Sequence, residues 1–325
     1  MGVGFAPVRK FGAVAFQTAM KSSISSGEGA VFDLSDRVKL LFTGADRLRF
    51  LNGQVSNNIR LATETRSVHA CVLSSKGRMD ADVFISSKPN SLHVDADAAL
   101  HETLQERFER YLIADDVAIE DVTNELAIFH VTENSPPVLP NESKWIAAER
   151  FGAPGWDLWV KVARHDELLQ ELLTRLPFCD HECAEKLRIE RGIPRWGFEL
   201  TSEIIPIEAN LEASCIDYEK GCYIGQEVIS RMKMSGQTNK RLCGLVSKTG
   251  VPLAYGMRLT PVSEENKDVG WISSAVRSER LEKFIALGFV KRGFNQVGTL
   301  LRARLPKSTK DVKGIRVEII TLPFV

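Results

Sequence analysis

The residues best suited to chemistry lie between positions 220 and 227, in the order Lys-Gly-Cys-Tyr-Ile-Gly-Gln-Glu. Gly221 and Gly225 can adopt positive φ angles or let a ligand approach the backbone closely. A cysteine between two glycines is predicted to be accessible, and the ammonium of Lys220 would favour the thiolate form of Cys222, which is the nucleophilic form. The residues alone leave two interpretations open: a reactive thiol, or a tight turn that contains a buried structural thiol.

Other common catalytic motifs are absent from the sequence. It contains no G-x-x-x-x-G-K-[ST] phosphate loop, no G-x-S-x-G nucleophile elbow and no H-E-x-x-H zinc motif. Gly2 and Gly4 have no strand before them, so they do not fit a dinucleotide-binding turn. The six histidines are dispersed along the chain, and we expect none of them to be catalytic. These observations exclude P-loop NTPases, common hydrolases and metalloproteases.

The six cysteines are too sparse for a disulfide scaffold, so we expect free thiols and a reducing compartment. Cys179 and Cys183 flank His181, which raises the possibility of a metal site. No second pair follows at zinc-finger spacing. Packing at the start of a helix is therefore the preferred interpretation, and we predict no metal.

Charge and composition bound the class of protein. The chain has 325 residues, with 42 Lys and Arg against 42 Asp and Glu, and 44% of its residues are hydrophobic. This is the composition of an ordinary soluble globular protein with two to three domains. A net charge of zero argues against bulk electrostatic binding to nucleic acid or an anionic membrane. We therefore expect neither a membrane nor a nucleic acid as partner.

The elements that must position the motif fall into three parts: an N-terminal segment (1–30), an α+β region (31–235) and a C-terminal barrel (236–325). In the α+β region, short apolar runs alternate with stretches that have helical spacing. Strands are expected there at 31–34, 38–42, 71–74, 83–86, 92–94, 117–119, 126–131 and 156–162. Helices are expected after 46, over 97–113 and 166–176, up to 191, and from 226. The barrel strands are expected at 242–246, 257–259, 270–275, 285–290 and 315–321.

The motif at 220–227 resembles the signature of the YgfZ family of folate-binding proteins. That family is distantly related to the glycine-cleavage T-protein, an aminomethyltransferase. Further segments resemble the two groups in the same order along the chain: 32–35, 44–54, 75–82, 187–194 and 286–290. The eight-residue signature is the specific part of the resemblance, and the other segments support it by their order.

The resemblance implies a three-domain, cloverleaf-like ring. Two interleaved, ferredoxin-like α+β domains and an antiparallel β-barrel would surround a central hole that holds tetrahydrofolate or another reduced folate. Glu190 matches the pterin-binding glutamate of the T-protein, and one carboxylate can accept two adjacent N–H donors of a pterin ring. The residues expected to bind the cofactor are Glu190, Lys220, Gly221, Tyr223, Gly225, Gln226, Glu227 and Arg231.

The resemblance also implies an accessory role in iron–sulfur cluster assembly or repair, with Cys222 as the key residue and client or assembly proteins as partners. The alternative is a tetrahydrofolate-dependent aminomethyl or one-carbon transferase. The T-protein carries two adjacent aspartates after its glycine turn, and ungapped alignment from Gly77 places Ala81 and Asp82 there. Asp82, or Asp80 in its place, would then be the acid–base residue.

The resemblance leaves the enzyme question open between these two roles. A third interpretation is a binding scaffold that has lost its ligand. We expect a monomer in the bacterial cytoplasm, with an organelle matrix as the alternative because residues 1–27 lack acidic side chains.

Overall fold

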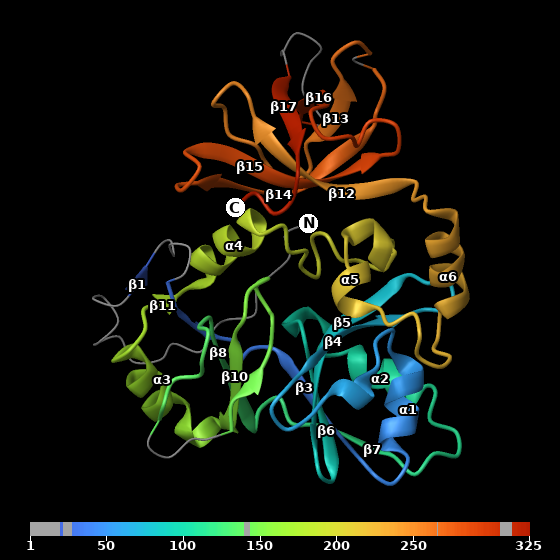
Figure 1. The fold of residues 1–325 in the computed structure, drawn as a ribbon, viewed down its shortest axis with the longest axis vertical. Helices are drawn as coiled ribbons and strands as arrows, with labels where there is room; N and C mark the ends of the chain where they lie inside the picture. Colours follow the sequence, from blue (N-terminus) through green and yellow to red (C-terminus); the bar gives the residue numbers. More distant parts are fainter. Residues whose placement is uncertain (1–19, 22–27, 140–143, 265, 306–313) are drawn as a thin grey trace.

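The computed structural model describes residues 20–21, 28–139, 144–264, 266–305 and 314–325. Most of the predicted N-terminal segment, 1–30, lies outside the described residues. The described chain forms three lobes, two of them built on a sheet and the third a barrel (Figure 1). The α+β class with a C-terminal antiparallel barrel is confirmed.

The first lobe is a five-stranded sheet with the order β4-β5-β6-β3-β7. Its strands are β3 (Val38–Thr43), β4 (Val68–Leu73), β5 (Met79–Lys88), β6 (Ser91–Ala96) and β7 (Ala118–Asp121). The helical elements of this lobe are α1 (Arg47–Gln54), η1 (Ile59–Leu61), η2 (Ala98–Leu100) and α2 (Leu104–Glu109). Apolar side chains from the sheet and from these helices share one buried cluster, which holds the helices against the sheet.

The second lobe is a six-stranded sheet with the order β1-β11-β2-β8-β10-β9. Its strands are β1 (Met20–Lys21), β2 (Val31–Asp33), β8 (Leu126–Val131), β9 (Ile146–Ala147), β10 (Trp156–Lys161) and β11 (Phe178–Cys179). The helical elements η3 (Val162–Arg164), α3 (His165–Leu173) and α4 (His181–Glu190) follow β10 and β11. Strand β2 precedes the whole first lobe in sequence, so the two lobes are interleaved along the chain.

The third lobe is a closed antiparallel barrel with the order β12-β15-β14-β13-β16-β17. Its strands are β12 (Lys240–Ser247), β13 (Arg258–Pro261), β14 (Gly270–Ser278), β15 (Lys283–Lys291), β16 (Leu300–Arg304) and β17 (Ile315–Ile320). Three short helices connect the sheets to the barrel: η4 (Pro206–Ala209), α5 (Glu212–Cys215) and α6 (Gln226–Ser235). Strand β16 was not predicted, whereas the other five barrel strands were.

The expected helix at 97–113 is shorter than its apolar spacing predicted. The Asp97 side chain accepts a hydrogen bond from Ala99 N and starts the separate turn η2. The α-helix then begins only at Leu104. Leu100, Leu104 and Phe108 are nevertheless all buried, so the apolar pattern identified the buried face but not the break.

Buried ion pairs join the two sheets. The guanidinium of Arg150 donates to Asp95 on β6 and to Asp157 on β10, over distances of 2.7–2.9 Å. His130 lies 2.8 Å from the same Asp157 carboxylate. One arginine thus bridges carboxylates from both lobes, which fixes the orientation of the two lobes where they meet.

Cys179 and Cys183 form a disulfide in this structure, which corrects the expectation of free thiols at these positions. Cys179 ends β11, and Cys183 lies in the first turn of α4, where its N–H is capped by the Asp180 carboxylate. This turn brings the two Cα atoms to 5.3 Å, within disulfide range. No cluster of metal-binding side chains occurs within the described ranges.

Candidate functional site

The signature motif forms the end of the loop between α5 and α6 and the first residues of α6 (Figure 1). Cys222 is exposed and its thiol is free. The interpretation of Cys222 as a buried structural thiol is therefore wrong. The exposed thiol is open to a partner or a redox reagent.

Lys220 anchors this loop from below. Its ammonium donates to the backbone carbonyls of Asn52, Val55 and Asn57 at 2.6, 2.7 and 2.8 Å. Burial lowers the pKa of Lys220 to about 8. Three carbonyls occupy the three N–H bonds of the ammonium, so Lys220 fixes the loop onto the last turn of α1 and the segment that follows it. Its predicted role in cofactor binding stays a prediction.

The two glycines of the motif have different surroundings. Gly225 has a φ of +84°, and a Cβ there would lie 2.6 Å from the carbonyl oxygen of Ser74 and 3.2 Å from Gly77 Cα. A Cβ at Gly221 would meet nothing within 4 Å. Gly225 is therefore required by close packing against the turn between β4 and β5. Only Gly221 leaves open space at the backbone.

The remaining motif residues lie near the start of α6. Tyr223 is buried, and burial raises its pKa above the usual range. Gln226 begins α6, and its N–H donates to the carbonyl of Tyr223 at 3.2 Å. Glu227 and Arg231 form an exposed ion pair of 2.5 Å on that helix. The structure thus places these residues on the outside of α6 or beneath the loop, and their binding roles stay predictions.

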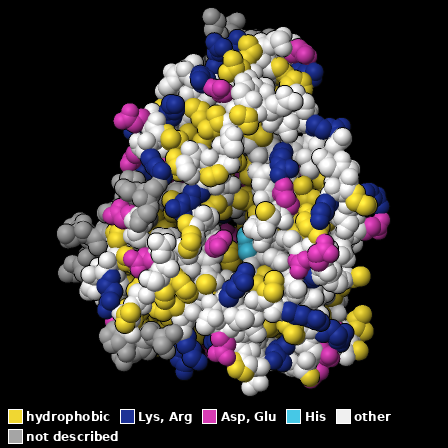
Figure 2. Space-filling view, in the orientation of Figure 1, with side chains coloured by type: hydrophobic (Ala, Val, Ile, Leu, Met, Phe, Trp, Pro, Cys, Tyr) yellow, Lys and Arg dark blue, Asp and Glu magenta, His cyan; other side chains and the backbone are white. Residues whose placement is uncertain are grey.

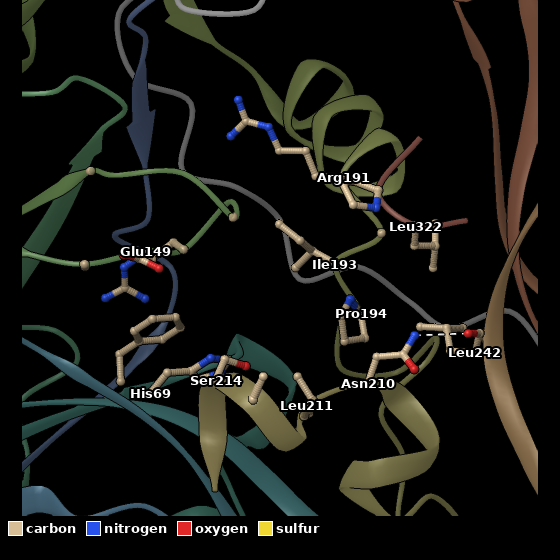
Figure 3. Close-up of a pocket in the computed structure, with 18 of the residues that line it drawn as sticks. His69, Glu149, Arg191, Ile193, Pro194, Asn210, Leu211, Ser214, Leu242 and Leu322 are labelled. Atoms are coloured by element: carbon tan, nitrogen blue, oxygen red, sulfur yellow. Dashed lines mark hydrogen bonds between the residues drawn. The ribbon is translucent and has the colours of Figure 1, made fainter. Parts of the chain in front are cut away.

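A cavity of about 900 Å³ opens where the three lobes meet. Its wall includes His69 and Phe84 from the first sheet, Trp156 from the second, and Leu242 from the barrel. Figure 2 shows a hollow at this junction, with a histidine and side chains of both charges at its rim. Figure 3 shows labelled wall residues from all three lobes, with the 3.0 Å hydrogen bond from Asn210 Nδ2 to the Leu242 carbonyl. The volume of the cavity lies in the range of small-molecule binding sites.

None of the ten predicted site residues belongs to the wall of this cavity as traced through the described part of the chain. Glu190 comes nearest in sequence, because Arg191, Gly192, Ile193 and Pro194 do line it. The Glu190 carboxylate is buried against the barrel instead, where it accepts a 2.5 Å hydrogen bond from the Ser278 hydroxyl. The predicted residues and the cavity are therefore separate features.

Asp82 lies one side chain behind the cavity wall. Its Oδ2 is 3.3 Å from Nε2 of His69, whose Nδ1 is 3.1 Å from Sγ of Cys215. The ring of Phe84 stacks on His69 with a centroid distance of 4.2 Å and an interplanar angle of 5°. His69 itself lines the cavity. Of this group, only Asp82 was predicted.

Asp80, the proposed substitute for Asp82, has a different partner. It accepts a 2.6 Å hydrogen bond from Nε of Arg107. The same guanidinium also donates to the Gln54 side chain and to the carbonyl of Leu73. These contacts tie Asp80 to α1 and α2 and give it a structural role.

Sequence reasoning missed His69 and Cys215. The two residues are 146 positions apart, so no local motif joins them. One signal was present: the alternation along β4 and β5 places His69 and Asp82 on the same sheet face. Only the position of α5 against β4 brings Cys215 to that face.

Comparisons with known proteins agree with this architecture. Residues 240–325 match the family model described as the glycine cleavage T-protein C-terminal barrel domain. An aminomethyltransferase of Aquifex aeolicus is 36% identical over 158 residues, which cover 47% of this chain and 42% of that protein. An aminomethyltransferase of Shouchella clausii is 25% identical, over 90% of this chain and 86% of that protein.

Two further matches extend the comparison. The iron-sulfur cluster assembly factor IBA57 homolog, mitochondrial, of Dictyostelium discoideum is 24% identical over 69% of this chain and 64% of that protein. The crystal structure of the glycine cleavage system aminomethyltransferase T from Bartonella henselae superposes with a TM-score of 0.79. It covers 92% of this chain and 87% of its own, at 17% identity. The chain thus has the T-protein-like fold and carries the C-terminal barrel domain of that superfamily.

Proposed function

We propose that the protein is a tetrahydrofolate-binding accessory factor for iron–sulfur cluster assembly or repair, with Cys222 as its working residue. The observation that carries this proposal is the separation of two features in one molecule. An open cavity lies between the lobes, and an exposed thiol lies on an anchored loop outside it. Because the two features are separate, the protein can bind a ligand in the cavity while the Cys222 thiol contacts a partner protein.

The cavity suits a reduced folate by volume and by charge. Arg66 and Arg191 lie in its wall, where they can bind the carboxylates of a glutamate tail. Trp156 and Phe84 add apolar surface for the ring system. When bound, a reduced folate would supply a carrier for one-carbon units. Glu190 keeps its proposed role as a residue next to the wall, because it directly precedes Arg191, which lines the cavity.

The exposed position of Cys222 supports a partner role. Lys220 and Gly225 hold the loop at both ends through backbone contacts, so the thiol has a defined position on the surface. The Dictyostelium relative is named as an iron–sulfur cluster assembly factor. The partners proposed are iron–sulfur client or assembly proteins, and the protein itself is proposed to act as a monomer.

Calorimetric titration with tetrahydrofolate under anaerobic conditions tests the folate site. We expect saturable binding that Arg191→Met and Glu190→Gln weaken and that Cys222→Ser leaves unchanged. Absence of binding by the wild-type protein would contradict the folate part of the proposal.

The accessory role is tested in cells that lack the protein. Wild-type protein should restore the activity of an iron–sulfur enzyme, and Cys222→Ser should not. Met234→Ala is the matched control, because Met234 is also exposed and lies on α6. Full restoration by Cys222→Ser would contradict the proposed role of the thiol.

The alternative function is a tetrahydrofolate-dependent aminomethyl or one-carbon transferase, favoured by the Shouchella relative, which matches over most of both chains. In that case Cys222→Ser would keep transfer activity and Asp82→Asn would lose it.

No helix in the described residues is both long and apolar enough to cross a bilayer. The compartment we propose is the bacterial cytoplasm, with an organelle matrix as the alternative.

A further inference from the structure

A continuous chain of polar groups runs from the cavity into the first sheet. The hydroxyl of Ser214 lies 3.3 Å from Sγ of Cys215, which lies 3.1 Å from Nδ1 of His69. Nε2 of His69 lies 3.3 Å from Oδ2 of Asp82. These four residues come from α5, β4 and β5, so tertiary packing assembles the chain of groups.

The two ends of this chain differ in access to the cavity. Ser214 and His69 both belong to the cavity wall, and Figure 3 shows them next to each other there. Cys215 is fully buried behind them. Asp82 is not in the wall, so it can exchange protons with a ligand only through another group.

The charges of the surrounding groups favour a protonated His69. Burial opposes the charged ring, but the hydrogen bonds to Asp82 and Cys215 and the charge of Asp82 outweigh it and raise the pKa of His69. Burial would raise the pKa of Asp82, but His69 and then Arg37 keep it below the usual range. At neutral pH the pair is therefore a carboxylate and an imidazolium.

The thiol between His69 and Ser214 is neutral at the same pH. Burial, reinforced by the neighbouring Cys71, raises the pKa of Cys215 well above its usual range, and the charge of His69 only partly offsets this effect. A neutral thiol both donates and accepts hydrogen bonds. Its sulfur can accept from Nδ1–H of His69 while its S–H donates to the Ser214 hydroxyl. The hydrogen bonds from His69 through Cys215 to Ser214 then all run in the same direction, with each group donating to the next.

We propose that Asp82, His69, Cys215 and Ser214 form a proton relay that delivers a proton to a basic atom of the ligand in the cavity. The proposal rests on the proposed function, in that the cavity holds a ligand. The ligand class is a small molecule with an amine or ring nitrogen that gains a proton. His69 is the acid, and Asp82 is a positioning residue that acts through it.

The transfer moves one proton and no electrons. The basic atom of the ligand takes the O–H proton of Ser214, and the Ser214 oxygen takes the S–H proton of Cys215. The sulfur takes the Nδ1 proton of His69. His69 ends as a neutral imidazole that keeps its Nε2–H toward the Asp82 carboxylate, and reprotonation from solvent restores the starting state.

The resting charge of the relay is measured without any ligand, by NMR titration of the protein labelled with ¹³C-histidine. We expect the His69 signal, assigned by its loss in His69→Gln, to titrate above pH 8 and to move down by about one unit or more in Asp82→Asn. His93 is the internal reference, because burial lowers its pKa to about 4. A wild-type His69 that titrates below pH 7 would overturn the proposal.

The path of the proton is tested by rapid mixing with tetrahydrofolate in weak buffer that contains a pH indicator. We expect Cys215→Ala to slow the proton exchange that accompanies binding by on the order of tenfold. Cys215→Ser, which still carries a transferable proton, should restore the rate. Cys243→Ala is the matched control, because Cys243 also lines the cavity but its thiol donates to the carbonyl of Arg241 and not to a member of the relay. Equal rates in Cys215→Ala and wild type would overturn the relay.

The two experiments separate this inference from the proposed function. If tetrahydrofolate does not bind, the proposed function fails, and the titration of His69 still decides whether the acid exists. If tetrahydrofolate binds without any proton exchange, the proposed function survives and the relay is refuted.

Discussion

Cys215 and Cys222 belong to one segment and are seven residues apart, yet they lie in opposite environments. Cys222 is exposed on the loop, whereas Cys215 is fully buried beside an imidazole. The loop is held by hydrogen bonds from the Lys220 ammonium to backbone carbonyls and by the close packing of Gly225 on the turn between β4 and β5. The buried cluster around His69 is held by side-chain hydrogen bonds. The comparison shows that one short segment supplies an outward-facing thiol and a thiol buried behind the cavity wall.

The largest expected difference between the two regions is thiol reactivity. In the native protein, Cys222 should react with a disulfide reagent more than about a hundredfold faster than Cys215, because a buried thiol reacts only after local opening. Mass spectrometry of peptides after timed labelling measures both rates. Cys222→Ser should remove the fast phase, and equally fast labelling of Cys215 would contradict its burial.

The two glycines of the loop sharpen the comparison within the motif. Gly225→Ala should lower the free energy of unfolding by about 3–4 kcal/mol, because a left-handed residue would also press its Cβ against the Ser74 carbonyl. Gly221→Ala should change it by less than about 0.5 kcal/mol, since its Cβ would meet open space. Urea denaturation measures both. Similar values for the two variants would show that the contact with Ser74 is not decisive.

The contribution of Lys220 to the stability of the loop is the next prediction. Lys220→Met should cost about 3 kcal/mol of unfolding free energy, because the carbonyls of Asn52, Val55 and Asn57 lose a charged donor. Lys233→Met, at an exposed position on α6, is the control and should stay near wild type. Retention of full stability by Lys220→Met would mean that water replaces the ammonium at no cost.

The ion pair of the buried cluster should give a characteristic pH dependence. Asp82→Asn should be less stable than wild type by about 2 kcal/mol between pH 5 and 6.5. The pKa of His69 is raised in the folded state, so the stabilisation by the His69–Asp82 ion pair is fully present below the ordinary histidine pKa. It is lost as the pH rises through the raised pKa of His69. Chemical denaturation from pH 5 to 10 measures the difference, and a constant difference would contradict a protonated His69.

The smallest effect is expected on the outer face of α6. Glu227→Gln should change stability by less than about 0.5 kcal/mol, because an exposed i,i+4 ion pair contributes little. Its effect on tetrahydrofolate binding is then free of any folding defect. A measurable loss of binding would restore Glu227 to the folate site.

Much of the architecture could be predicted from local patterns. Alternating apolar residues identified five of the barrel strands, and the stripe of leucines over 166–176 predicted α3. The break at Asp97 was missed, because a side-chain cap competes with helical spacing without changing the apolar pattern. The disulfide was missed as well, since sparse cysteines do not reveal that a turn brings Cys179 and Cys183 together.

The candidate site divides in the same way. From the sequence by itself, an accessible Cys222 was one of two interpretations, because glycines on either side of a cysteine favour an open turn. The tertiary structure decided between them, since Lys220 holds the loop on carbonyls more than 160 residues earlier in the chain. Only the tertiary structure decided that His69 and Ser214 line the cavity, that Asp82 lies behind them and that Cys215 joins the two. The physical reason is range. A turn depends on backbone angles within a few residues, whereas this series of hydrogen bonds depends on how α5 packs on strands β4 and β5, which lie more than 100 residues earlier.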